Sequence, residues 1–237
     1  MINFQQLSDS DRERLARQAI AGIGFRSEHL DKSYPKQFDN YKGQNFNAIM
    51  RQIAQAAPVQ RPNSILLVGV VGAGKSSLLA AFAKTYFEAF GFKRPSTKPK
   101  FLPACFQDQA AYCTHTELSK LWEHEFDDDQ SFVNPEYFTH VPALFLDDIG
   151  TAPVNQSGRN IAKLEELLDY RWGSHLKTFA ASNVTLADLL KPPLRNDWIR
   201  IVRRLSEKEW MFYHLMPEPY HIANKQKGEK SEIKTAS

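Results

Sequence analysis

The sequence predicts an α/β fold in which helices cover both faces of a parallel sheet. Three short runs, at residues 65–68, 143–146 and 178–181, are apolar or nearly so and have the length of strands. Uniform apolarity is typical of parallel strands that are buried on both faces. Segments with helical periodicity separate the runs, and strands that alternate with helices build a parallel sheet. A chain of 237 residues is long enough for one large domain with extensions.

The remaining elements follow from capping signals and apolar periodicity. Ser8 or Ser10 can cap a polar helix over residues 8–20, and Thr114 and Glu117 form a T-x-x-E capping box before another helix. We expect further helices at 45–57, 75–90, 161–171 and 194–208, and strands at 111–115 and 210–215. Residues 92–109 are expected to form a loop or small insertion, and the polar chain after 225 a disordered tail.

Composition sets limits on the class of protein. Hydrophobic residues make up 42% and charged residues 24%, an ordinary globular balance, and the net charge of +3 permits an anionic partner without requiring one. Cys105 and Cys113 provide neither a disulfide framework nor metal-ligand spacing. The N-terminus has no signal-peptide pattern, and no apolar stretch is long enough to cross a bilayer. We therefore expect a cytoplasmic protein without a membrane partner.

A phosphate-binding loop follows the first strand. The motif G-x-x-x-x-G-K-[ST] is complete, with an apolar strand before it and a helix after it. Its glycines let backbone N–H groups converge on phosphates at a helix N-terminus. Lys75 is expected to reach the β- and γ-phosphates of ATP, and Ser76 to ligate Mg²⁺. The predicted nucleotide-binding residues are Gly69, Val71, Gly72, Ala73, Gly74, Lys75, Ser76 and Ser77.

Two carboxylates follow the second apolar strand, in the segment LFLDDIG. Behind a phosphate-binding loop this is the expected place of a Walker B motif. Asp147 is then predicted to hold Mg²⁺, and Asp148 to polarise the attacking water as general base. The alternative is a strand that only exits into a polar turn over Asp148, Ile149 and Gly150.

Taken together, GVVGAGKSS, LFLDDIG and FAASN resemble the AAA+ ATPases of the DnaC/IstB group over residues 25–215. The resemblance implies a P-loop NTPase with an AAA+ core, dependent on ATP and Mg²⁺, and without a separate C-terminal lid. The expected domains are an N-terminal extension at 1–60, the ATPase core at 61–216 and a polar tail at 217–237.

The same resemblance implies roles for residues outside the Walker motifs. Asn183 matches the sensor position, on a strand between the two Walker strands; alternatively, it only turns the chain into the next helix. Arg200 and Arg204 share one face of a basic helix, and the resemblance implies that one acts on ATP from a neighbouring subunit. Which of Arg200, Arg203 and Arg204 does so stays open, as does pairing with the acidic residues Glu165 and Glu166.

The resemblance further implies a replicative helicase loader that acts in the initiation of DNA replication, with the helicase and single-stranded DNA as partners. The alternative is an IstB-like transposition ATPase that assembles on double-stranded DNA beside a transposase. Either would form a homo-oligomeric ring or helical filament with ATP. A small-molecule kinase and a non-hydrolysing scaffold fit the Asp-Asp pair less well. A basic loop, containing Lys93, Arg94, Lys98 and Lys100, is a candidate DNA contact.

Overall fold

The computed structural model describes residues 8–25, 64–71, 75–90, 109–123, 134–152, 158–191, 195–205 and 210–215. Several predicted features lie outside these residues: the helix at 45–57, the basic loop near residues 93–100, the polar tail, and Gly72, Ala73 and Gly74. Within the described part of the chain, no helix is long and apolar enough to cross a membrane.

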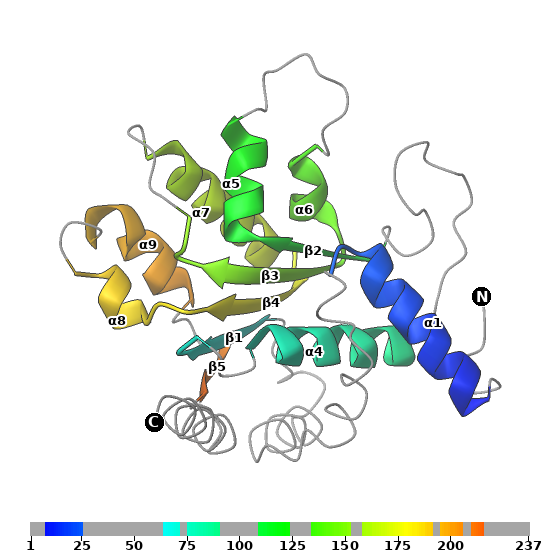
Figure 1. The fold of residues 1–237 in the computed structure, drawn as a ribbon. Coiled ribbons are helices and arrows are strands. Elements are labelled where there is room, and N and C mark those ends of the chain that lie inside the picture. Colours follow the sequence, from blue (N-terminus) through cyan, green and yellow to red (C-terminus); the bar gives the residue numbers. More distant parts are fainter. Residues whose placement is uncertain are drawn as a thin grey trace, which may run out of the picture.

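Among the described residues, five parallel strands form a sheet in the order β2-β3-β4-β1-β5 (Figure 1). They are β1 (Ser64–Gly69), β2 (Ala110–Thr114), β3 (Ala143–Ile149), β4 (Lys177–Ser182) and β5 (Trp210–Leu215). The strand that ends at Ser182 lies between the two strands that lead into the predicted Walker motifs. Because carboxyl ends of parallel strands meet at one edge of a sheet, this order gathers Gly69, Asp147 and Asn183 there.

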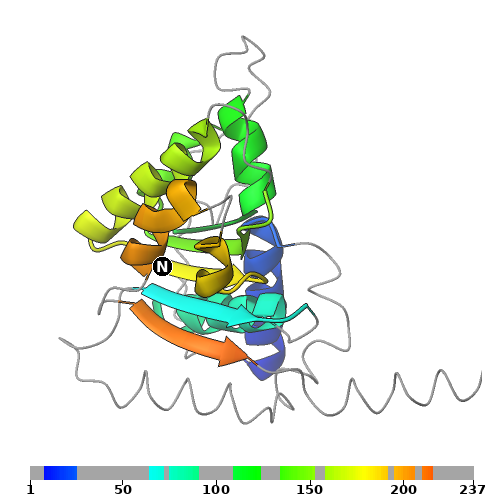
Figure 2. The same ribbon diagram turned by 90° about the vertical axis from the view of Figure 1, so that its left-hand side faces the viewer.

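Helices cover both faces of the sheet, as predicted. Alternate residues such as Leu67, Tyr112 and Phe145 form one core with α1 (Asp9–Gly22) and α4 (Lys75–Phe90). Their neighbours, including Leu66 and Leu144, form a second core on the other face. That core is covered by α5 (His115–Glu123), α6 (Glu136–His140), α7 (Arg159–Gly173), α8 (Leu186–Leu189) and α9 (Arg195–Leu205). Figure 2 shows the two helical layers on either side of the sheet.

Local signals explain where most elements begin. The Ser8 hydroxyl accepts a hydrogen bond from the Asp11 N–H, so Ser8 is the cap of α1. The predicted capping box is present, because the Glu117 carboxylate accepts from the Thr114 N–H at 2.8 Å and the Thr114 hydroxyl accepts from the Glu117 N–H at 3.1 Å. The box starts α5 at His115, which the sequence placed in the preceding strand. Helix α6 was not predicted, because its five residues are too few to show helical periodicity.

Arg171 holds several of these elements together from within the protein. It is 1% exposed, and its Nη1 donates to the carbonyl oxygens of Phe138 at 2.9 Å and Val141 at 2.8 Å. Its Nε donates to the Thr178 hydroxyl at 3.0 Å. Burial lowers the pKa of this guanidinium to about 9. A single side chain on α7 therefore ties α6 and the residue that follows it, Val141, to β4.

Candidate nucleotide-binding site

Lys75 is the first residue of α4 and lies beside the end of β1. Its side chain is buried, and Nζ donates to the Gly69 and Val70 carbonyl oxygens, at 2.8 Å each. Burial lowers the pKa of Lys75, while the charges of Asp147 and Asp148 oppose that shift. The amine is thus fixed at the N-terminus of a long helix, next to two carboxylates.

The rest of the predicted phosphate-binding loop is described in part. Gly69 ends β1, and Val71 is 81% exposed in the turn that follows. Ser76 and Ser77 are half-buried in the first turn of α4, where N–H groups and the helix dipole favour an anion. The wrapping of the loop around phosphates stays a prediction, because its central residues lie outside the described part.

Asp147 is buried near the end of β3, with both carboxylate oxygens in hydrogen bonds. Oδ1 accepts from the Asp148 N–H at 2.9 Å, and Oδ2 accepts from the Tyr112 hydroxyl at 3.3 Å. Burial and the neighbouring Asp147 charge raise the pKa of Tyr112, which keeps its hydroxyl protonated and able to donate. The sequence motifs do not identify Tyr112 as a residue of the site. Its position depends on the pairing of β2 with β3, where Tyr112 lies opposite Phe145.

Asp148 is the half-buried residue that follows Asp147 on β3, and its backbone is left-handed, with φ 56°. Its Oδ1 accepts a hydrogen bond of 2.6 Å from Asn183 Nδ2. Its carbonyl oxygen accepts from the Thr151 hydroxyl at 2.7 Å. The structure thus brings two predicted catalytic residues into direct contact at the ends of neighbouring strands. Whether Asn183 acts as a sensor stays a prediction.

The turn after Asp148 is anchored from two sides. The Ser182 hydroxyl donates to the Ile149 carbonyl oxygen at 2.8 Å. The Gly150 N–H donates to His115 Nδ1 at 3.4 Å. His115 is completely buried, which lowers its pKa to about 4, and its ring packs edge-on against Trp198 of α9, with centroids 5.8 Å apart. His115, another residue that the sequence did not single out, therefore lies between the Asp148–Gly150 turn and the arginine-bearing helix.

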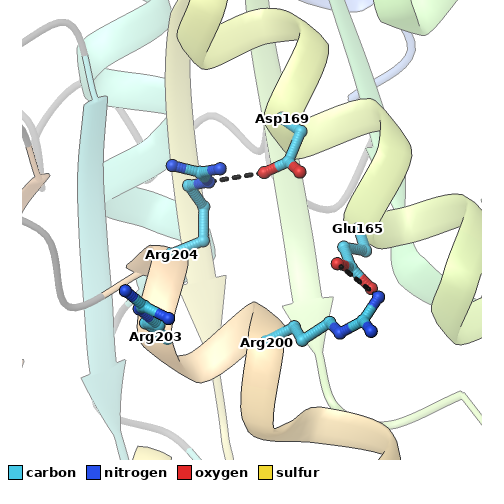
Figure 3. A pocket seen from close by; sticks show the side chains of 5 residues that line it. All are labelled: Glu165, Asp169, Arg200, Arg203 and Arg204. Atoms are coloured by element: carbon cyan, nitrogen blue, oxygen red, sulfur yellow. Dashed lines mark hydrogen bonds and ion pairs between the residues drawn. The ribbon is translucent and has the colours of Figure 1, made fainter.

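The predicted arginines lie on α9 and face the acidic side of α7 (Figure 3). Arg200 Nη1 is 3.5 Å from Glu165 Oε1, and Arg204 Nε is 2.5 Å from Asp169 Oδ1. The Arg204 guanidinium also stacks 4.6 Å from the Trp172 ring centroid. Arg203 has no partner among the described residues. Together these arginines and carboxylates line a cavity of about 430 Å³.

This arrangement confirms one sequence alternative, pairing of the basic helix with acidic residues of α7, in a modified form. Glu165 is a partner as expected, but the second partner is Asp169, whereas Glu166 lies 3.7 Å from Lys163. Both pairs are intramolecular; Arg200 is exposed, whereas Arg204 and Glu165 are half-buried. The role of either arginine in a neighbouring subunit stays a prediction.

The residues at the end of β3 fit a hard divalent cation. Mg²⁺ prefers carboxylate and hydroxyl oxygens, and it is usually held by one or two protein ligands together with phosphate oxygens. Asp147 supplies a carboxylate, and both of its oxygens accept hydrogen bonds from uncharged donors. Ser76 supplies a hydroxyl in the first turn of α4. The amine of Lys75 supplies the cation that a polyphosphate would need beside them.

No family profile and no curated protein matches the chain. Solved structures do share its fold. The crystal structure of DnaI is 22% identical, with a TM-score of 0.53 over 85% of this chain and 97% of that one. The DnaC helicase loader is 17% identical, with a TM-score of 0.52 over 79% and 100%. AMPPCP-bound DnaA from Aquifex aeolicus is 14% identical, with a TM-score of 0.51 over 73% of this chain and 47% of that one.

At these identities the comparisons establish the fold. The predicted α/β fold, a parallel sheet between two layers of helices, is confirmed, and the chain shares this fold with DnaI and the DnaC helicase loader. The chain spans about half of the length of the DnaA structure that it matches.

Proposed function

We propose that this chain is a Mg²⁺-dependent ATPase that loads a replicative helicase during the initiation of DNA replication. One observation carries the ATPase part: the buried Lys75 amine, Asp147, and the hydrogen-bonded pair Asp148–Asn183 converge at one edge of the sheet. A cation, a metal-binding carboxylate and a base are the groups that phosphoryl transfer to water requires.

Each residue then has a distinct role. Lys75 binds the β- and γ-phosphates, and Ser76 and Asp147 hold Mg²⁺, which neutralises charge that develops on the phosphate oxygens. Asp148 accepts the proton of the attacking water, and Asn183 orients Asp148 through its 2.6 Å hydrogen bond. Arg200 or Arg204 stabilises the transition state from a neighbouring subunit.

The loader role is supported by the fold shared with the DnaC helicase loader and DnaI, and nucleotide binding by the fold shared with AMPPCP-bound DnaA. In this proposal, residues 1–60 form the extension that binds the helicase, 61–216 the ATPase core, and 217–237 the tail. The protein acts in the cytoplasm on single-stranded DNA as an ATP-dependent ring or filament.

Two measurements test the proposal. Lys75→Ala should weaken binding of a fluorescent ATP analogue at least tenfold and abolish turnover, whereas Lys163→Ala on α7 should behave as wild type. In a separate pull-down experiment, the wild-type chain should capture the host replicative helicase. The amount captured is compared in the presence and absence of ATP. Wild-type turnover in Lys75→Ala rejects the ATPase. Failure to capture the helicase, combined with a preference for double-stranded over single-stranded oligonucleotides, replaces the loader with the transposition ATPase.

A further inference from the structure

The edge of the sheet beside Asp147 is covered by the N-terminal segment. Helix α1 ends at Gly22, and the Ile23 carbonyl oxygen accepts a hydrogen bond of 2.8 Å from the Tyr112 N–H on edge strand β2 (Figure 1). Gly24 follows with φ 109°, and a Cβ there would lie 3.0 Å from the Tyr112 carbonyl oxygen. The close approach therefore requires glycine, and it fixes the end of α1 against β2.

Phe25 fills the space that this turn creates. Phe25 is buried, and its ring stacks on that of Tyr112 with centroids 4.0 Å apart. The ring of Phe145 is tilted against that of Phe25, with the two centroids 5.9 Å apart. The Tyr112 ring is thereby held on one side by the N-terminal segment. Its hydroxyl points to Asp147 Oδ2, at 3.3 Å. A continuous set of contacts runs from α1 through Phe25 and Tyr112 to the carboxylate.

We infer that Tyr112 is a positioning residue for Asp147, and that Phe25 makes this positioning depend on where the N-terminal segment lies. The inference rests on the proposed function, in which Asp147 holds Mg²⁺. Asp147 Oδ1 accepts a hydrogen bond from the backbone N–H of Asp148, on the same strand. The restraint on Oδ2 comes from a different strand, because its donor is the Tyr112 hydroxyl on β2. A displacement of α1 loosens that restraint and lowers metal affinity at the nucleotide site.

The experiment measures affinity for AMPPCP in the full chain, with Mg²⁺ and with EDTA, so that turnover is not needed. Tyr112→Phe keeps the ring stack and removes only the hydroxyl. We expect the gain in affinity due to Mg²⁺ to fall about tenfold, with metal-free affinity unchanged, because a hydrogen bond to a charged group is lost. Tyr137→Phe is the matched control: its hydroxyl makes a bond of the same 3.3 Å length to the Ala110 carbonyl oxygen.

The second variant, Phe25→Leu, keeps an apolar side chain and removes the stacking. Phe25→Leu should reduce the gain in affinity due to Mg²⁺ about threefold. The double variant with both Tyr112→Phe and Phe25→Leu should show the same gain as Tyr112→Phe alone, because Phe25 acts through the Tyr112 hydroxyl. A wild-type gain in Tyr112→Phe overturns the positioning role, and additive effects in the double variant overturn the role of Phe25. If the wild-type chain does not bind AMPPCP at all, the proposed function fails, and the inference fails with it.

Discussion

Asn183 Nδ2 donates a hydrogen bond of 2.6 Å to Asp148 Oδ1 across the ends of two neighbouring strands. The contact fixes a carboxylate whose own backbone is left-handed, a conformation that a non-glycine residue adopts at an energetic cost. The Thr151 hydroxyl and N–H both donate to the Asp148 carbonyl oxygen and hold the turn in place. Strained residues of this kind concentrate at functional sites, which agrees with the base role proposed for Asp148.

The first prediction concerns this pair. Asp148→Asn should lower kcat by a factor of about 10² to 10⁴, because an amide cannot accept the proton of water. Asn183→Ala should also lower kcat, by a smaller factor, because it removes only the restraint on Asp148. Both variants should bind ATP with near wild-type affinity. Steady-state ATPase assays and nucleotide titrations measure the two quantities separately.

The exposed Glu166→Gln on α7 serves as the control for loss of a negative charge. If Asp148→Asn hydrolyses ATP at the wild-type rate, Asp148 is not the base. The double variant combines Asp148→Asn with Asn183→Ala. If its kcat falls by the full product of the two single factors, Asn183 acts independently of Asp148.

A second prediction uses two glycines. Gly150 has φ 89°, and a Cβ there would lie 3.1 Å from Leu189 Cδ2, so Gly150→Ala should lower the free energy of unfolding by about 1–3 kcal/mol. Gly173, at the end of α7, has open space where a Cβ would lie, with no neighbouring atom within 4 Å. Gly173→Ala should therefore be neutral or slightly stabilising. Chemical denaturation of both variants gives the comparison, and equal effects would show that the Gly150 turn is not strained by a side chain.

How much of this site could be predicted depended on whether the signal was local. The strand and helix on either side of the loop before Lys75, the carboxylates after the apolar part of β3 and the capping box at Thr114 all have local signals in the sequence. The described structure contains each of these features, although the centre of the loop lies outside it. The end of β3 was placed too early, at Leu146, because the charged Asp147 interrupts the apolar run although its side chain is buried and hydrogen-bonded.

Residues that act through tertiary contacts gave no such signal. Tyr112 reaches Asp147 only because β2 pairs with β3, and His115 reaches Gly150 only because α5 packs over that strand. Arg171 reads as an ordinary basic residue near the end of a helix until the fold buries it among carbonyl oxygens. Residues that belong to a local motif can be identified from the sequence, whereas residues whose role depends on strand order cannot.

The third prediction concerns pH. Burial lowers the pKa of His115 from 6.5 to about 4, so the unfolded chain binds a proton there more readily than the folded chain. The resulting stability is complete above pH 6.5 and is lost as the pH falls toward 4. When the pH falls from 7 to 5, uptake of this proton by the unfolded chain alone should lower the free energy of unfolding by about 2 kcal/mol.

Denaturation at pH 7 and pH 5 measures the effect, with His115→Asn and the exposed His140→Asn compared with wild type. The loss on acidification should be smaller by that amount in His115→Asn and unchanged in His140→Asn. An identical pH dependence in all three proteins would show that folding does not lower the pKa of His115.

The last prediction concerns assembly. Arg200 and Arg204 are held by Glu165 and Asp169 on α7, but the Arg200 pair spans 3.5 Å with the arginine 77% exposed, and exposed pairs contribute only about 0–1 kcal/mol. A neighbouring subunit that presents a triphosphate can therefore draw Arg200 away at little cost. A head-to-tail contact of this kind closes into a ring or continues as a filament. ATP and Mg²⁺ should promote the oligomer, and specific activity should rise with protein concentration.

For whichever arginine acts on the neighbouring site, substitution by alanine should lower turnover by about 10³-fold or more while ATP affinity and thermal stability stay close to wild type. Arg14→Ala, which removes an exposed arginine from α1, is the control. Mixing the inactive arginine variant with Lys75→Ala should restore part of the activity, because the first retains an intact nucleotide site and the second supplies the missing arginine. Light scattering that finds a monomer with AMPPCP, together with specific activity independent of concentration, would contradict an arginine supplied by a second copy of the chain.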